Sequence, residues 1–131
     1  MSGQEAAGPP AVGQLDFDRL DVYQVALQFQ ALVPRLVPRR GYAALRQQFE
    51  RASTSIVLNI AEGAGRTMAR DKAQFYAIAR GSAMECASVL DIFLARGLLT
   101  ANSHRHARGL LVRAVEMLTR LSAPAKSCTC T

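Results

Sequence analysis

The chain has 131 residues, the size of one ordinary domain; 50% are hydrophobic, 6% are aromatic and none is tryptophan. Its net charge is +6, and arginine supplies 14 of the 16 basic residues. The sequence contains no run of roughly 20 apolar residues and no secretory signal pattern, which argues against a membrane-spanning or secreted protein and indicates a cytoplasmic one.

Four segments repeat apolar residues at spacings of three and four, as amphipathic helices do. They span residues 18–36, 42–62, 68–96 and 103–121. Because short turns join long helices, we expect antiparallel neighbours and an all-α, up-down-up-down four-helix bundle over residues 15–121. Residues 1–14 and 122–131 are predicted to be a flexible leader and a flexible tail.

Breaking and capping residues define the expected helix ends. Pro34 is expected to kink or end the first helix, and Gly63 to end the second in the left-handed conformation. Thr67 is expected to cap the third helix, and Asn102 or Ser103 to cap the fourth. In the third helix the seam expected to face the core consists of Phe75, Ala79, Ser82, Cys86, Val89 and Phe93, and in the fourth of Ala107, Leu111, Ala114, Leu118 and Leu121.

The second and third segments carry more apolar side chains than one bundle can cover. The surplus residues are Val57, Leu58 and Ala61 on the second segment and Ala77, Met84, Ala87 and Ala95 on the third. A helix that is apolar all round is covered on all sides, and the second cover would come from another subunit. This pattern predicts a homo-oligomer; the alternative is a scatter of exposed small residues.

One row of polar residues lies beside the apolar seam of the second helix. Ser55, Asn59 and Glu62 recur at i, i+4 and i+7; on the third helix, Ser82 lies in the apolar seam and Glu85 on the row of Ile78 and Ile92. Groups this close to a core need hydrogen-bond partners. We interpret these five residues as a structural polar network that fixes helix register.

A carboxylate site built on Glu62 and Glu85 is the catalytic alternative. No nucleophile, metal-ligand set or phosphate-binding loop accompanies the two residues, so we expect a protein that is not an enzyme.

The cysteines and histidines do not form a metal-binding pattern. Cys86 falls inside a helical segment and is expected to be buried, whereas Cys128 and Cys130 lie in the predicted tail. His104 and His106 are two residues apart and point away from each other on a helix. We therefore predict neither a metal nor a cofactor.

Two motif blocks resemble the family of proteins encoded in 23S rRNA intervening sequences. They are Ser55–Arg66, read as S-I-x-x-N-I-A-E-G-x-G-R, and Phe75–Glu85, read as F-x-x-I-A-R-G-S-A-x-E. The resemblance extends over residues 15–121. Pro34 and the Cys-Thr-Cys-Thr end of the chain depart from the family's pattern.

The resemblance implies a small cytosolic four-helix bundle that assembles as a homopentamer and has no established enzymatic activity. The family is similar to the accessory variability proteins of diversity-generating retroelements, which are basic pentamers that bind nucleic acid and a reverse transcriptase. A pentamer agrees with the surplus apolar surface of the second and third segments.

The charge pattern adds a functional hypothesis. Residues 1–30 carry a net charge of −3 and the remainder +9, and arginine suits phosphate contacts. The candidate nucleic-acid contacts are Arg39, Arg40, Arg46, Arg66, Arg70, Arg105, Arg108, Arg113 and Arg120. Since most aromatic residues lie in the seams, base stacking is poorly supplied and we expect weak sequence preference.

Two functions therefore remain open. The first is an oligomeric scaffold that binds RNA or DNA. The alternative is a homo-oligomeric adaptor for another protein with no nucleic-acid role, in which the arginines serve solubility and ion pairing.

Overall fold

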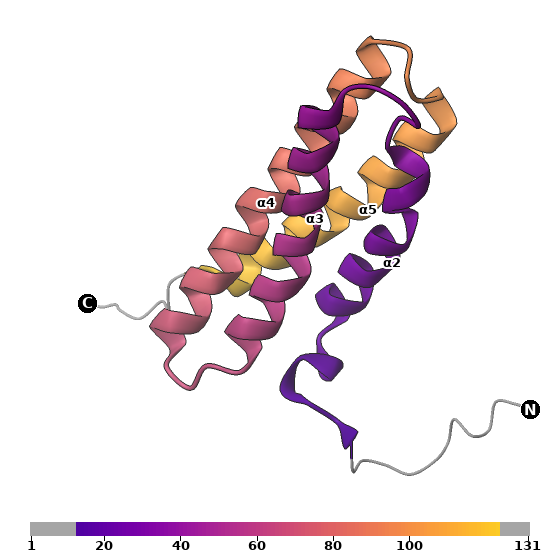
Figure 1. Ribbon diagram of the computed structural model, residues 1–131. Helices are drawn as coiled ribbons and strands as arrows, with labels where there is room; N and C mark the ends of the chain where they lie inside the picture. The colour runs from indigo at the N-terminus through magenta and orange to yellow at the C-terminus, as the bar shows by residue number, and fades with distance from the viewer. Residues whose placement is uncertain (1–12, 124–131) are drawn as a thin grey trace, which may run out of the picture.

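The computed structural model describes residues 13–123, which form four α-helices and one short 3-10 helix (Figure 1). The elements are η2 (Asp16–Arg19), α2 (Asp21–Leu36), α3 (Ala43–Ala64), α4 (Ala69–Ala95) and α5 (Ala101–Leu121). No strand occurs between residues 13 and 123, so this part of the chain is all-helical. The predicted leader lies almost wholly outside the described residues, as does the tail from Pro124 on, including Cys128 and Cys130.

The helices pack as neighbours around one core: α3 on α4, α4 on α5, α5 on α2, and α2 on α3. Side-chain contacts give the direction of two of these pairs. Ser55 faces Ser82 across α3 and α4, while Gln48 near the start of α3 faces Glu85 further along α4. In the α4–α5 pair, Arg80 contacts Thr119 and Asp91 contacts His104. Later residues of one helix thus meet earlier residues of the next, as in antiparallel packing.

Three phenylalanines occupy the centre of the core. Phe49 of α3 contacts Phe29 of α2 and Phe93 of α4 edge to face, with ring centroids 6.0 and 5.8 Å apart. All three rings are at most 1% exposed. Such pairs add to the stabilisation that their burial provides. The aromatic cluster therefore links three of the four helices.

The seam predicted for α4 is correct in part. Ala79, Cys86 and the two residues after them in the seam, Val89 and Phe93, are buried, but Phe75 and Ser82 are only half-buried. Their neighbours one position on, Tyr76 and Ala83, are buried instead. The buried face is therefore turned toward α5, and Ser82 lies at the α3–α4 boundary. Leu121, predicted to end the α5 seam, is 38% exposed.

Two of the predicted boundaries involving α2 and α3 are wrong. The first helix begins at Asp21, because Leu20 is extended and separates it from η2; it then continues through Pro34 to Leu36. Gly63 does not end α3 in a left-handed conformation: it lies inside the helix, which ends at Ala64. A Cβ atom on Gly63 would lie 2.8 Å from the Tyr76 ring. This glycine therefore permits close packing of α3 on α4.

The predicted caps of α4 and α5 also differ from the structure. Met68, not Thr67, precedes α4 and provides no side-chain cap. Thr100, rather than Asn102 or Ser103, caps α5 by accepting a hydrogen bond from the backbone N–H of Ser103. In α5 the cap residue lies two or three positions earlier than predicted, because the apolar spacing from which the helix was predicted starts only in the second turn of α5.

Within the described residues, no helix combines the length and the apolar character that crossing a membrane requires.

Candidate nucleic-acid interface

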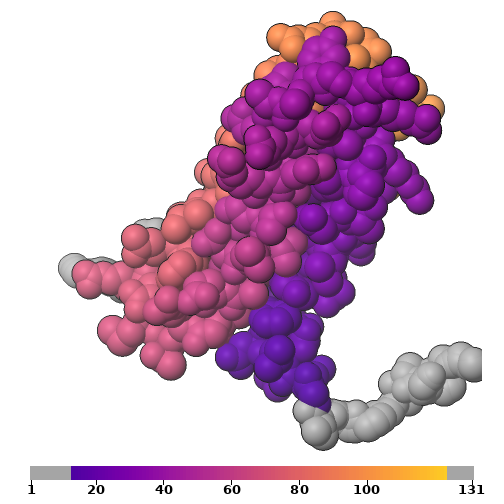
Figure 2. Space-filling model, in the orientation of Figure 1, coloured from indigo at the N-terminus to yellow at the C-terminus, as the bar shows by residue number. Residues whose placement is uncertain are grey.

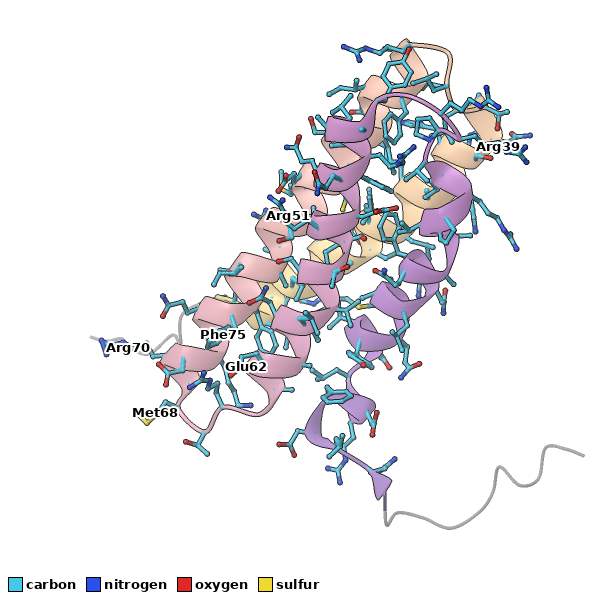
Figure 3. The ribbon with its side chains drawn as sticks, viewed as in Figure 1. Arg39, Arg51, Glu62, Met68, Arg70 and Phe75 are labelled. Atoms are coloured by element: carbon cyan, nitrogen blue, oxygen red, sulfur yellow. The ribbon has the colours of Figure 1, made fainter. Side chains whose placement is uncertain are left out.

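The predicted arginine contacts divide between opposite ends of the molecule. Figure 3 shows Arg39 at the end formed by the α2–α3 and α4–α5 turns, and Arg70 at the other end, beside Met68 and Glu62. Arg40 adjoins Arg39, and Arg105 lies in the second turn of α5. Arg66 lies in the turn that leads to Arg70, whereas Arg108, Arg113 and Arg120 follow along α5. The ninth candidate, Arg46, lies in the first turn of α3, so the nine arginines do not form one continuous surface.

Arg66 is held by neighbours of its own. Its Nη2 lies 2.6 Å from Oε2 of Glu62, one helical turn earlier, and its guanidinium lies over the Phe75 ring, 4.7 Å from the centroid. The ion pair is exposed, with 43% and 50% of the two side chains accessible, so it adds at most about 1 kcal/mol to stability. Both contacts compete with a phosphate for Arg66.

Arg108 is held more firmly. Its Nε and Nη2 donate to the two carboxylate oxygens of Asp91 on α4, at 3.0 and 3.3 Å. His104 Nε2 lies 2.8 Å from the same carboxylate, and since an ionised carboxylate only accepts, the imidazole donates. Hydrogen bonds from His104 and then from Arg108 hold the pKa of Asp91 below its usual value. Arg108 is thus a clamp between α4 and α5.

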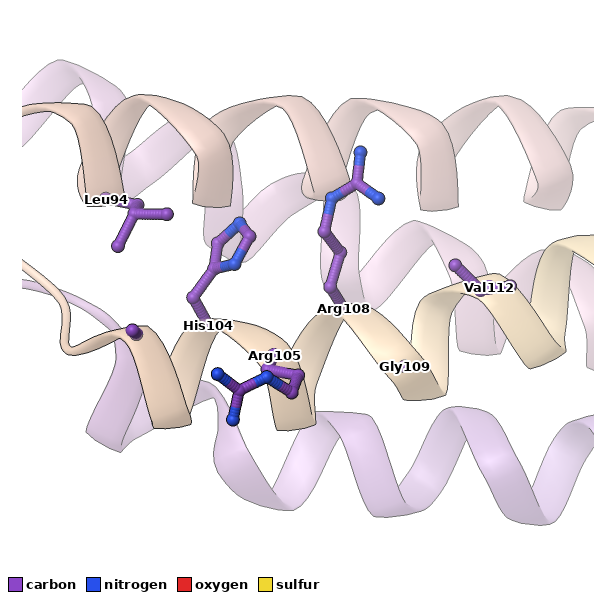
Figure 4. A pocket seen from close by; sticks show the side chains of 7 residues that line it. Leu94, His104, Arg105, Arg108, Gly109 and Val112 are labelled. Atoms are coloured by element: carbon purple, nitrogen blue, oxygen red, sulfur yellow. The ribbon is translucent and has the colours of Figure 1, made fainter.

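A hollow of about 440 Å³ opens beside this clamp (Figure 4). His104 and Arg108 extend from α5 toward α4 in this view, whereas Arg105 points away from them. Arg105 donates to Asn102 Oδ1 at 2.9 Å. A second hollow, of about 240 Å³, lies between α2 and α5 and is lined by Arg35 and His106. Basic side chains therefore border α5 on both sides of its first turns.

We name the end that carries Arg39, formed by the α2–α3 and α4–α5 turns, the basic end and define it as residues 34–49 and 92–106. It carries two histidines and no Asp or Glu; its arginines are Arg35, Arg39, Arg40, Arg46, Arg96 and Arg105. Figure 2 shows the orange α4–α5 turn and the purple start of α3 adjoining at this end. Neither segment contains a carboxylate, but Asp91 contacts His104, Glu85 contacts Gln48, and Glu50 directly follows the first segment, so the charge of the six arginines is offset only in part.

Tyr42, directly before α3, joins the two segments of the basic end. Its ring is half exposed, and the Arg96 guanidinium lies over it, 5.7 Å from the centroid. Its φ of 54° is the only positive value at a non-glycine residue between 13 and 123, and Gly41 before it has a φ of 74°. A left-handed backbone at a bulky residue costs roughly 1–2 kcal/mol. Such strain is often found at functional positions.

The opposite end is electrically mixed. Residues 13–24, 60–75 and 116–123 carry six acidic and five basic side chains. Lys72 is used for structure, because its Nζ donates to the backbone carbonyls of Gly63 and Ala64 at the end of α3. Arg70, Arg113 and Arg120 are exposed and make no ion pair among the described residues. Arg113 and Arg120 therefore do not pair with Glu116, which lies within one helical turn of each.

The five polar residues of the predicted network lie along the α3–α4 boundary in three separate groups. Ser55 Oγ and Ser82 Oγ are 2.8 Å apart, and Asn59 Nδ2 donates to Ser55 Oγ at 3.0 Å. Glu85 accepts from Gln48 at 3.0 Å, whereas Glu62 accepts from Arg66. The two carboxylates are therefore held by different partners.

Cys86 is fully buried, and burial, with a smaller contribution from the nearby Glu85 charge, raises the pKa of its thiol to about 12. A thiol with so high a pKa is a weak nucleophile. Between residues 13 and 123 no three His, Cys, Asp or Glu side chains are grouped as a metal site would require.

Sequence reasoning missed three residues of the basic end: Arg35, Arg96 and Tyr42. The signal that could have found them is the lack of any acidic residue in 34–49 and in 92–106. It becomes visible only when antiparallel packing places the two turns at the same end of the helices.

A family model described as 23S rRNA-intervening sequence protein matches residues 18–120. A search of curated proteins finds no match for the chain.

Proposed function

Because the chain belongs to the 23S rRNA-intervening sequence protein family, we propose that it is a non-enzymatic, homo-oligomeric scaffold that binds nucleic acid through arginines with weak sequence preference. The observation that carries this proposal is the basic end, where six arginines lie with no carboxylate in the same segments. Arginine on a surface of uncompensated positive charge favours phosphate backbones and releases their counterions.

We further propose that the four helices form an up-down-up-down bundle and that five copies assemble around one axis. Exposed apolar side chains support self-association: Leu58, Ile78, Met84 and Val112 are 61%, 45%, 50% and 44% exposed. On α4, Ala77, Met84 and Ala95 face outward, and the one charged residue on their line, Asp91, is paired with His104 and Arg108 of α5. A second copy that covered this face would bury them. The number five comes from the family resemblance.

The proposal includes no catalytic role for Glu62 or Glu85. Each is exposed and accepts a hydrogen bond from a different side chain, Arg66 or Gln48. Carboxylates that act together in catalysis point into a common site. Glu62 and Glu85 are held by different side chains, which does not favour such an arrangement.

Two measurements test the proposed function. Fluorescence anisotropy with labelled RNA and DNA between ~50 and ~200 mM salt should show affinity that falls steeply, because several phosphates are neutralised per complex. Absence of binding at the lowest salt would remove the nucleic-acid role and leave the adaptor.

Light scattering of the purified protein tests the assembly. The wild-type mass should be five times the 14.2 kDa of one chain, and Met84→Glu should lower it while the helical circular-dichroism signal is kept. The matched control is Glu116→Gln, on the outer side of α5. A monomeric wild-type protein would contradict the assembly.

A further inference from the structure

We propose that the basic end holds an unpaired stretch of nucleic acid, with phosphates on Arg39 and Arg40 and a base stacked on Tyr42. The inference rests on the proposed function and deepens it, because it names the place of binding and the form of the strand. Nucleic-acid binding elsewhere on the molecule would leave the proposed function intact and remove this inference.

The α2–α3 turn carries two arginines that could bind phosphate. Arg39 and Arg40 are exposed, follow Pro38 in the α2–α3 turn, and make no hydrogen bond or ion pair among residues 13–123. The nearest acidic residues along the chain are Glu50 and Asp91, outside both segments of the basic end. Asp91 is already paired with His104 and Arg108. Arg39 and Arg40 are therefore available to a phosphate.

Tyr42 provides an exposed aromatic ring beside these arginines. Tyr42 is 42% exposed, whereas Phe29, Phe49 and Phe93 are at most 1% exposed and cannot meet a ligand. The Tyr42 ring lies two residues from Arg40, so a ring and two guanidinium groups occur in one turn. Proteins that hold single strands combine aromatic stacking with a basic track in this way.

The turn is held in place before any ligand arrives. Arg46 Nη1 donates to the carbonyl of Pro38 at 3.2 Å and approaches that of Gly41 at 3.5 Å, which ties the turn to the first helical turn of α3. Arg96 lies over the Tyr42 ring and ties it to the end of α4. A ring already fixed in position loses little freedom when a base stacks on it.

An unpaired strand fits these features better than a duplex. In a duplex the bases are stacked on one another, so the Tyr42 ring could reach none of their faces and only the arginines would contribute. Phosphate and exposed base occur in both single-stranded RNA and single-stranded DNA. Separate RNA and DNA oligonucleotides of one sequence therefore distinguish the two sources.

The first test compares Tyr42→Asn with Tyr42→Phe, by anisotropy with unpaired RNA, unpaired DNA and duplex DNA. Asparagine tolerates the left-handed backbone, so Tyr42→Asn should stay folded and should bind unpaired strands about ten-fold more weakly. Tyr42→Phe keeps the ring and should bind as the wild type does. Duplex binding should change little in either variant. Unaltered unpaired-strand affinity in Tyr42→Asn would overturn the stacking contact.

The second test removes the same charge at the two ends. Arg39→Gln/Arg40→Gln should make the salt dependence for unpaired strands shallower, by about 1.4 in the slope of log affinity against log salt. Arg70→Gln/Arg120→Gln, at the opposite end, should leave the slope as in the wild type. Equal effects of the two pairs would overturn the basic end as the binding place. Failure of the wild type to bind any nucleic acid would instead remove the proposed function.

Discussion

The two ends of the molecule use the same residue type in different ways. At the basic end, Arg39 and Arg40 project from a turn whose neighbouring segments contain no carboxylate. At the opposite end, Arg66 is paired with Glu62 and stacked on Phe75, and Lys72 donates to the end of α3, while the unpaired Arg70 and Arg120 lie in segments that also hold six acidic residues. The count of basic residues therefore does not locate a binding surface, because the carboxylates in the same region set the local potential.

The ends also differ in how their cores are closed. Beneath the basic end, three phenylalanine rings meet around Phe49. At the opposite end, α3 and α4 approach closely because Gly63 leaves room for the Tyr76 ring. The core near the basic end is therefore filled by large side chains, whereas close packing at the opposite end depends on the absence of a side chain at Gly63.

The largest expected effect is a loss of stability when the central ring of the aromatic cluster is removed. Phe49→Ala removes a fully buried ring in contact with Phe29 and Phe93, and should lower the free energy of unfolding by about 3–5 kcal/mol. Urea unfolding followed by circular dichroism measures it. The control at the opposite end is Phe17→Ala, which removes a half-buried ring in contact with the half-buried Tyr23. Equal losses in the two variants would contradict the described core.

The next effect tests the close packing at the opposite end. Gly63→Ala places a Cβ 2.8 Å from the Tyr76 ring and should destabilise the protein by about 1–3 kcal/mol through overpacking. In Gly109→Ala, which has open space on α5, the new methyl group should stabilise the helix by about 0.5–1 kcal/mol. Thermal unfolding of both variants decides the point, and the prediction fails if the two midpoints shift in the same direction.

A smaller effect concerns the clamp near the basic end. The lowered pKa of Asp91 means that its hydrogen bonds with His104 and Arg108 stabilise the folded protein above the ordinary aspartate pKa of about 3.9, and that this contribution is lost as the pH falls through the lowered value. Asp91→Asn should therefore reduce stability at pH 7 by up to about 1 kcal/mol, given the exposed carboxylate. The difference from the wild type should shrink as the pH falls below 4. A pH-independent difference would contradict the assignment.

The smallest effect is a gain in stability at the basic end. Tyr42→Asn relieves the left-handed strain but loses the contact with Arg96, so the free energy of unfolding should rise by up to about 1 kcal/mol. Chemical unfolding measures it beside Tyr42→Phe, which keeps the ring and the strain. A clear loss of stability in Tyr42→Asn would show that the ring supports the fold rather than a ligand.

The helical segments could be predicted from the sequence because their apolar spacing is regular. Val22, Phe29 and Leu36 all reach the core, as the spacing of three and four indicates. Helix ends were predicted less well, because glycine has more than one use: Gly63 fits the pattern of a helix stop, yet its role depends on Tyr76 of another helix. Local sequence carries no information about such a contact.

Some residues of the candidate site could be predicted from the sequence and others could not. Arg39 and Arg40 stand out as a basic pair in a turn, and the structure leaves them exposed. Arg108, inside a predicted helix, was also a candidate contact, yet it is bound to Asp91, 17 residues away. For Tyr42 the only signal is its place in a segment without acidic residues, since neither its backbone conformation nor its contact with Arg96 follows from the residues beside it.

The most direct measurement is ultraviolet cross-linking of the unmodified protein to an unpaired oligonucleotide, followed by mass spectrometry of the peptides. The nucleotide is expected on the peptide Gly41–Arg46, which contains Tyr42. Cross-links confined to the opposite end, at residues 66–72 or 116–123, would contradict it.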